Sequence, residues 1–305
     1  MKILVATEKP FAPVAVEGIR KIVEESGNEL ALLERGSRAD LLSAVADAEA
    51  LIVRSDIIDR DVLDAAPKLR IVVRAGAGVD NIDLAYAREK AVVVMNTPGQ
   101  NANAVAELVF GMLVSMARNR FDGTSGFELK GKRLGLQAYG QVGRNVARIA
   151  KGFGMEVSAY DPYLDDAVLT AEGVTPVHDL HELYSNNRFV SLHIPATPDT
   201  RGSIGRDLVA LMPKGGILIN TARKEIIDEA SLLDILAERT DLMYIADVKP
   251  DREADFLALD AKRVMFTPKK MGAQTAEANI NAGLAAARQI VDYFTTGNER
   301  FRVNR

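Results

Sequence analysis

Five residues that follow an apolar run have the spacing of a phosphate-binding turn. They are Tyr139, Gly140, Gln141, Val142 and Gly143. In the dinucleotide-binding fingerprint, one glycine allows close approach to a pyrophosphate, and the next lets a helix pack closely on a strand. Gly140 and Gly143 occupy these two places, whereas Ala138 stands where the fingerprint has its first glycine. We therefore expect a bound dinucleotide, held by a turn of slightly different shape.

An acidic residue, Asp161, comes at the end of the next apolar run, residues 156–160. A carboxylate in this place accepts hydrogen bonds from the adenosine ribose and repels a 2′-phosphate. It therefore predicts NAD rather than NADP as the cofactor. The alternative is an ordinary strand–turn–helix that binds no ligand.

Two arginines end apolar runs in the first part of the chain. They are Arg54 and Arg74. Ligands of parallel α/β sheets collect at the carboxyl ends of the strands, and the guanidinium fork suits phosphate. We expect both side chains to bind a phosphorylated substrate. The alternative is that one or both form surface ion pairs.

Metal and thiol chemistry have little support in the sequence. The chain has no cysteine, which excludes disulfides, thiolate metal sites and cysteine nucleophiles. His178 and His181 lie three residues apart beside Asp179, but nothing nearby supplies the remaining ligands. We therefore predict no metal.

The elements that must position these residues form a regular alternation of short apolar runs and amphipathic segments. Strands buried on both faces and alternating with helices predict parallel, doubly wound α/β sheets. A break at Pro98 and Gly99 separates two series of strands, so we expect two lobes. The last helical pattern, residues 274–294, returns to the first lobe in this interpretation.

Length and composition set the class of protein. The chain has 305 residues, of which 48% are hydrophobic and 26% charged, and its net charge is −4. These values favour a folded two-domain protein and argue against disorder. Without a basic run, a nucleic-acid partner is not expected. Without an apolar stretch of about 18 residues or a signal sequence, we expect a cytoplasmic protein that does not bind membranes.

Seven segments, in chain order, resemble the D-isomer-specific 2-hydroxyacid dehydrogenases over nearly the whole chain. They are residues 74–83, 96–101, 106–108, 138–143, 160–162, 193–195 and 220–223. The resemblance is to the short form of the family, without C-terminal regulatory domains. It implies a flavodoxin-like substrate domain at residues 1–97 and 272–305, and a Rossmann NAD domain at residues 98–271. It also implies a cleft between the two lobes, where the chemistry takes place.

The resemblance also implies roles for individual residues. Arg223 matches the catalytic arginine, which binds the substrate carboxylate and C2 oxygen. The backbone amides of Ala77, Gly78 and Val79 would hold the substrate carboxylate, and Arg54 and Arg74 match phosphate-binding arginines of phosphoglycerate dehydrogenases. Further cofactor contacts fall on His193, Ile194, Pro195, Thr221, Ala222 and Asp247.

Two catalytic positions of the family are altered. The family glutamate position falls on Arg252, between Asp251 and Glu253, and the histidine position falls on Lys269. Either Lys269 transfers the proton, or the protein binds NAD without turnover. Desolvation and neighbouring positive charge favour the neutral lysine that a base must be, and a nearby glutamate would oppose this. Loss of the glutamate together with the histidine is therefore coherent, and we expect an active enzyme.

These observations lead to one expected activity and two alternatives. We expect NAD-dependent oxidation of D-3-phosphoglycerate to 3-phosphohydroxypyruvate, at the entry to serine biosynthesis. The alternatives are a reductase of glyoxylate, hydroxypyruvate or another D-2-hydroxy acid, and an inactive NAD(H)-binding sensor or scaffold. The helical pattern at residues 102–118 is apolar on most of its surface, so we expect a homodimer through this helix. Burial of the helix within its own domain is the alternative.

Overall fold

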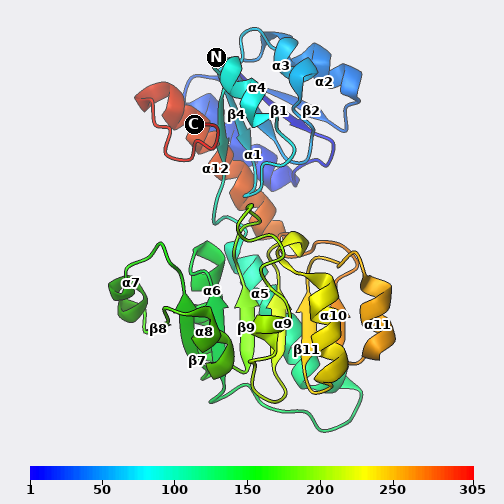
Figure 1. Ribbon diagram of the computed structural model, residues 1–305. Coiled ribbons are helices and arrows are strands. Elements are labelled where there is room, and N and C mark those ends of the chain that lie inside the picture. The colour runs from blue at the N-terminus through cyan, green and yellow to red at the C-terminus, as the bar shows by residue number, and fades with distance from the viewer. The chain divides into compact units, whose positions relative to one another are not determined.

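The chain, described over residues 1–305 by a computed structural model, divides into two compact units (Figure 1). Unit 1 consists of Met1–Asn101 and Gln274–Arg305, and unit 2 of Ala102–Ala273. Each unit is built on one parallel sheet, which confirms the predicted fold class. No helix combines the length and the apolar character needed to cross a membrane.

Unit 1 has a five-stranded sheet in the order β2-β1-β3-β4-β5. Its strands are β1 (Lys2–Thr7), β2 (Glu29–Glu34), β3 (Ala50–Val53), β4 (Ile71–Arg74) and β5 (Val93–Asn96). All pair in parallel, with Val5 opposite Ile52, for example. This is the flavodoxin-like order, in which the chain reverses its direction of travel across the sheet at the β1/β3 boundary.

Helices cover both faces of the unit 1 sheet because its strands are apolar on both faces. One face packs against α1 (Pro13–Glu25) and α12 (Ala276–Thr296). The other packs against α2 (Arg38–Ala44), α3 (Arg60–Asp64) and α4 (Leu84–Glu89), with a 3₁₀ turn at Val45–Asp47. The last helix of the chain, α12, therefore returns to the first sheet.

Unit 2 has a seven-stranded parallel sheet in the order β12-β11-β10-β9-β6-β7-β8. Its strands are β6 (Arg133–Gln137), β7 (Glu156–Tyr160), β8 (Thr175–Pro176), β9 (Phe189–Leu192), β10 (Ile217–Asn220), β11 (Met243–Ala246) and β12 (Val264–Phe266). Strands β9 and β7 lie on opposite sides of β6, so the topological switch point of this sheet lies between β6 and β9.

The helices of unit 2 also divide between two faces. One core contains α5 (Ala102–Ala117), α6 (Gln141–Gly152) and α7 (Asp166–Ala171). The other contains α8 (Leu180–Asn186), α9 (Arg206–Val209), α10 (Glu229–Glu238) and α11 (Glu253–Asp260). Short 3₁₀ turns lie at Asn119–Phe121 and Lys224–Ile226.

Helix α5 is apolar on most of its surface because unit 2 itself buries most of it. Val109, Phe110 and Leu113 are at most 4% exposed and belong to the core shared with α6. Packing within one chain thus explains why α5 is mostly apolar. It does not by itself require a second subunit.

Candidate cofactor and catalytic site

The turn between β6 and α6 leaves the first amides of the helix open to a ligand. Gly140 precedes α6, and no side chain caps the helix there. A Cβ at Gly140 would meet nothing within 4 Å, whereas one at Gly143 would lie 2.5 Å from the carbonyl oxygen of Ala138. The first glycine therefore leaves room for a ligand, and the second allows α6 to approach the strand. The N-terminal amides and the dipole of α6 together favour an anion such as a pyrophosphate.

Ala138 adopts the backbone conformation that favours glycine. Its φ is 80°, in the left-handed region, where an L-residue with a Cβ is strained by roughly 1–2 kcal/mol. Its amide donates to the carbonyl oxygen of Tyr160 at 2.8 Å, which ties the turn to the end of β7. The turn of the fingerprint is thus kept despite the missing first glycine.

Asp161, at the end of β7, links that strand to the phosphate-binding turn. Its carboxylate accepts hydrogen bonds from the amides of Tyr139 at 2.9 Å and Tyr163 at 3.0 Å. Each carboxylate oxygen keeps a further lone pair, so the group can still accept from a ribose. Sequence reasoning predicted the ribose role but missed this structural one.

The side chain of Tyr139 points into the protein. Its ring is 1% exposed, its hydroxyl donates to Glu172 at 2.8 Å, and Arg144 both pairs with Glu172 and lies over the ring. Burial raises the pKa of Tyr139, so the phenol stays a neutral hydrogen-bond donor. Tyr139 thus shapes the turn rather than offering its side chain to a cofactor.

Buried polar atoms without partners lie on β9 and just beyond the ends of β9 and β10. These atoms are Ser191 Oγ, His193 Nε2 and Thr221 Oγ1. The His193 ring also lies beside the helix start, since a Cβ on Gly143 would be 3.8 Å from its Cδ2. Buried polar atoms are normally hydrogen-bonded, so such a group of unpaired atoms at a switch point indicates a ligand.

His193 is a neutral imidazole. Burial lowers its pKa to about 3, and its backbone amide donates to the carbonyl oxygen of Gln137 at 2.9 Å. A group that protonates so far below neutral pH is a poor general acid or base. Its geometry instead suits contact with an uncharged part of a cofactor.

These features fit a dinucleotide. The open amides of α6 would hold the pyrophosphate, Asp161 the adenosine ribose, and the unpaired atoms of His193 and Thr221 the polar groups of the nicotinamide half. The neighbouring Ile194 and Ala222 are half-buried and pack on the adjoining core, and Pro195 accepts a hydrogen bond from Thr200 at 2.6 Å. Their contribution is therefore mainly to fix the backbone.

Arg223 follows β10 in a loop that Asn220 holds. The Asn220 side chain accepts from the amide of Ala222 and donates to the carbonyl oxygen of Arg223, both at 2.9 Å. The half-buried Arg223 guanidinium makes one hydrogen bond, to Ala222 at 3.0 Å. Its remaining donors can therefore bind a carboxylate or a carbonyl oxygen.

Asp247 clamps the loop that carries Lys269. The carboxylate is 1% exposed, and it accepts from Thr267 Oγ1 at 2.9 Å, Met271 N at 2.7 Å and Gly272 N at 2.8 Å. Both ends of the loop are therefore fixed. Lys269 lies exposed in the middle, and its ammonium forms no hydrogen bond or ion pair within the chain.

The segment at which the family glutamate was expected is held by local ion pairs. Glu229 accepts from the amides of Asp251 and Arg252 at 2.9 and 2.8 Å. Arg252 pairs with Asp255, and two further pairs are Lys224–Asp251 and Lys249–Glu253. Each carboxylate of residues 251–255 therefore has a cationic partner of its own.

In unit 1, the parallel register brings Arg54 and Arg74 to neighbouring strand ends. Arg74 Nε donates to the carbonyl oxygen of Arg54 at 3.0 Å. The Arg54 guanidinium lies over Phe11 and donates to the carbonyl oxygens of Lys9 and Pro10 and to the Asn279 side chain. Partial burial lowers the pKa of Arg54. Sequence reasoning missed these internal contacts.

The loop after β4 has three successive amides without an acceptor in the chain. They belong to Ala77, Gly78 and Val79. Gly76 makes room for the guanidinium of Arg74, because a Cβ at Gly76 would overlap its Nη1 at 1.6 Å. Consecutive open amides beside an arginine form a concavity that suits an anion.

Comparison with known proteins agrees with this geometry. A family model described as "D-isomer specific 2-hydroxyacid dehydrogenase, NAD binding domain" matches residues 104–269. The chain belongs to the D-isomer-specific 2-hydroxyacid dehydrogenases. The predicted family and the NAD cofactor are thereby confirmed.

Two named relatives and one solved structure are similar to this 2-hydroxyacid dehydrogenase. A D-3-phosphoglycerate dehydrogenase of Methanocaldococcus jannaschii is 39% identical over 88% of this chain and 54% of its own length. A hydroxypyruvate reductase of Thermotoga maritima is 36% identical over 84% of this chain and 88% of its own. The crystal structure of NAD⁺-bound 3-phosphoglycerate dehydrogenase from Entamoeba histolytica is 47% identical, with a TM-score of 0.88, and covers 100% of this chain and 99% of that one. The chain thus spans about half the length of the first of these relatives.

The residues that sequence reasoning missed in this dehydrogenase hold other residues in place. Asn279 lies on α12 and Glu172 after α7, both remote in sequence from the groups that they bind. Glu229 had the sequence signal of an ordinary acidic first helical turn. No group of three His, Asp or Glu side chains lies together as a metal site, and His178 instead pairs with Asp166.

Proposed function

We propose that the chain oxidises D-3-phosphoglycerate to 3-phosphohydroxypyruvate with NAD⁺, at the entry to serine biosynthesis. Residues 98–271 would form the NAD domain, and residues 1–97 with 272–305 the substrate domain. The choice of a phosphorylated substrate rests on Arg54 and Arg74, which lie side by side at the ends of adjacent strands. The open amides of residues 77–79 would hold the substrate carboxylate.

NAD⁺ supplies the hydride acceptor in this proposal. Arg223 binds the substrate carboxylate and the C2 oxygen, and stabilises the negative charge that develops on that oxygen. Lys269, in its neutral form, removes the proton of the C2 hydroxyl. His193 contacts the nicotinamide half without exchanging a proton, since it is uncharged at neutral pH.

The contacts at the altered catalytic positions support Lys269 as the base. The carboxylates of residues 251–255 are all paired with other cations, so none of them is free to orient a histidine or to charge a lysine. Lys269 is exposed, so bound substrate and cofactor must supply the desolvation that favours its neutral form.

Two other functions compete with this proposal. Reduction of hydroxypyruvate or glyoxylate is favoured by the Thermotoga maritima relative, whose name is hydroxypyruvate reductase. A sensor or scaffold that binds NAD(H) without turnover is favoured by the replacement of the family histidine by Lys269. NADH absorbance, followed with D-3-phosphoglycerate, D-glycerate and D-lactate and in reverse with hydroxypyruvate, separates the three. Selective turnover of the phosphorylated acid supports the proposal, and no turnover with any acid supports the sensor.

We further propose a homodimer through α5. The helix keeps one exposed strip within unit 2, and Gly111 on that strip has open space where a Cβ would stand, which allows close approach of another helix. Sedimentation equilibrium at micromolar concentration is expected to give twice the chain mass. A chain mass under these conditions would contradict the dimer.

A further inference from the structure

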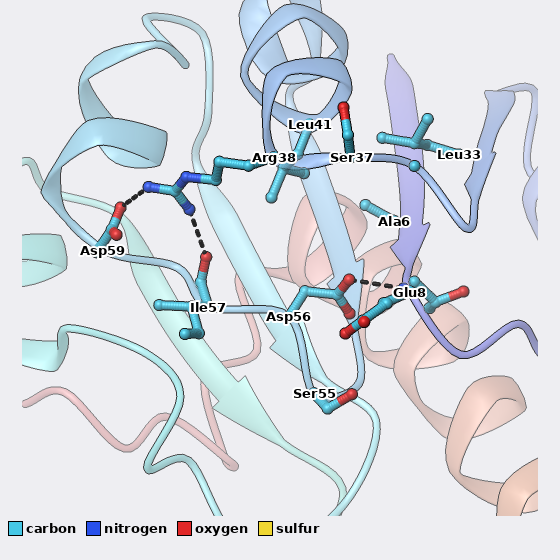
Figure 2. Close-up of a pocket in the computed structure, with 12 residues that line it drawn as sticks. Ala6, Glu8, Leu33, Ser37, Arg38, Leu41, Ser55, Asp56, Ile57 and Asp59 are labelled. Atoms are coloured by element: carbon cyan, nitrogen blue, oxygen red, sulfur yellow. Dashed lines mark hydrogen bonds and ion pairs between the residues drawn. The ribbon is translucent and has the colours of Figure 1, made fainter.

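The unit 1 sheet has a cavity of about 440 Å³ at its topological switch point. The residues that line it lie at the carboxyl ends of β1 and β2, in the loops after β1, β2 and β3, and in α2 (Figure 2). From β1 the chain continues to α1 on one face of the sheet, and from β3 to α3 on the other. Loops that part in this way leave a crevice at the carboxyl edge, where open α/β sheets bind ligands. None of the residues assigned above to phosphate or cofactor lines this cavity.

Two buried oxygen atoms of the lining residues have no hydrogen-bond partner. Asp56 Oδ1 accepts the amide hydrogen of Glu8 at 2.7 Å, but its Oδ2 is buried and unpaired (Figure 2). Thr7 is 2% exposed, and its Oγ1 is likewise unpaired. A buried acceptor without a donor is costly, and more so when it is charged. Both observations therefore indicate a missing hydrogen-bond partner, and the carboxylate oxygen of Asp56 requires that this partner be a donor.

The charges around the cavity favour a cationic donor. Arg38, the arginine of the lining, is bound to Asp59 and to the carbonyl oxygen of Ile57 (Figure 2). Arg54 acts on Asp56 through space, but its own hydrogen bonds go to other groups. Glu8, which is exposed, forms no ion pair. Asp56 and Glu8 therefore make one side of the cavity negatively charged.

The opposite wall of the cavity is apolar. Leu33 and Leu41 line it above Ala6 (Figure 2). No group of three or more His, Asp or Glu side chains that could hold a metal ion is present. An organic cation with an aliphatic part would place its charge at the negatively charged side and its hydrocarbon part against the apolar wall.

We propose that this cavity binds a small primary amine with a short aliphatic chain. Its ammonium donates to Asp56 Oδ2 and Thr7 Oγ1, and Glu8 contributes charge at the mouth. The chain packs against Leu33 and Leu41. Such an amine is protonated at neutral pH, as lysine is.

Amide chemical shifts of the ¹⁵N-labelled full chain, titrated at constant ionic strength, test the proposal. The probe is n-butylamine hydrochloride, and n-butanol is its uncharged control. We expect saturable shifts at Glu8, Ser55 and Asp56 with n-butylamine, with a dissociation constant of about 1 mM, and none with n-butanol. Equal shifts with both compounds, saturation by magnesium chloride instead, or no shifts at all would overturn the proposal. If no shifts occur, water alone forms the hydrogen bonds with Asp56 Oδ2 and Thr7 Oγ1.

Two variants locate the site. Asp56→Asn keeps an oxygen for the Glu8 amide and removes the charge, so n-butylamine affinity should fall at least about tenfold. Glu8→Gln, at an exposed position that folding does not need, should weaken binding several-fold. The control is Glu25→Gln, an exposed carboxylate of the same unit outside the cavity, which should bind n-butylamine as the unmodified chain does. Unchanged affinity in both Asp56→Asn and Glu8→Gln would place the amine elsewhere and overturn the proposal.

Discussion

The carboxylate of Asp161 accepts the amide hydrogen of Tyr139 at 2.9 Å, so the residue that we propose contacts the adenosine ribose also holds the turn before α6. The same group accepts from the amide of Tyr163. Its charge and its hydrogen-bonding capacity therefore have separate consequences. A charge-removing substitution and a truncation distinguish them.

We expect Asp161→Asn to narrow the preference for NAD⁺ over NADP⁺ with a modest loss of affinity for NAD⁺, because asparagine keeps one acceptor oxygen. Asp161→Ala should also narrow the preference for NAD⁺. It should weaken the binding of both cofactors further, because the amides of Tyr139 and Tyr163 lose their acceptor. Dissociation constants for NADH and NADPH, measured by fluorescence, give the ratio. Asp199→Asn, an exposed carboxylate of the same unit, is the control. An unchanged ratio in both Asp161 variants would show that Asp161 does not contact the ribose.

Ala138 is strained in the turn, and glycine should relieve that strain. With φ at 80°, Ala138→Gly is expected to raise the free energy of unfolding by about 1 kcal/mol. Ala258→Gly, in the exposed interior of α11, is the matched control and should lower it by about 1 kcal/mol. Urea unfolding of the two variants measures both values. A loss of stability in Ala138→Gly would mean that the turn does not hold Ala138 in the left-handed region.

The buried imidazole of His193 should make the fold sensitive to mild acid. Its pKa is about 3 in the folded chain and 6.5 in the unfolded chain, so below pH 6.5 the unfolded state binds one more proton. The stability that His193 contributes is complete above pH 6.5 and is lost as the pH falls, by about 1.4 kcal/mol per unit until near pH 3. The free energy of unfolding between pH 7.5 and 5, compared with that of His193→Gln, isolates this loss. Identical pH slopes in the two proteins would contradict a buried neutral His193.

The parts of this protein that sequence predicted are those that depend on local pattern. Gly140, Gly143 and Asp161 have the spacing of the dinucleotide-binding fingerprint and lie at the predicted strand–turn–helix, and the Val- and Ile-rich runs form the expected strands. The contacts that sequence could not give join residues far apart in the chain, such as Arg54 with Asn279 on α12. They depend on how elements pack, and no periodicity records that.

Asp247 shows the same limit at the loop that carries Lys269. Its position after β11 suggested a cofactor contact, but its carboxylate lies where three donors of the 267–272 loop converge. The sequence showed that an aspartate stands at this place, but it could not show which groups the carboxylate binds. Ala138 is similar, because the sequence shows a departure from glycine and only the backbone shows that the conformation is kept.

Arg74→Ala should raise the KM for D-3-phosphoglycerate far more than the KM for NAD⁺. A charge-assisted phosphate contact contributes about 1.5–3 kcal/mol, which corresponds to roughly 10- to 150-fold. Arg54 also binds Lys9, Pro10 and Asn279, so Arg54→Lys is the milder test there and Arg54→Ala should in addition lower stability. Arg20→Ala, an exposed arginine on α1, is the control. If neither arginine affects the phosphorylated substrate selectively, the phosphoglycerate assignment fails while the dehydrogenase family stands.

Lys269 carries the catalytic proposal. Only a neutral lysine can accept the C2 hydroxyl proton, so the rate of oxidation should rise with pH. Loss of a general base costs about 10²- to 10⁴-fold, and Lys269→Ala should lose this much kcat while binding NADH normally. Lys269→Arg should be almost as slow, because arginine keeps its proton. Lys269→His should recover little, since the carboxylates of residues 251–255 are paired with other cations and none is free to orient the ring.

Steady-state kinetics and NADH binding separate these outcomes for Lys269. Lys262→Ala, an exposed lysine of unit 2, is the matched control and should keep normal turnover. Because Asp247 fixes the loop at Thr267, Met271 and Gly272, removal of the Lys269 side chain should leave the loop backbone in place. A fall in kcat without a fall in NADH affinity therefore reports proton transfer. Near-normal turnover of Lys269→Ala would make the lysine a bystander, and the base would then have to be sought among residues 251–253, because His193 stays neutral and buried.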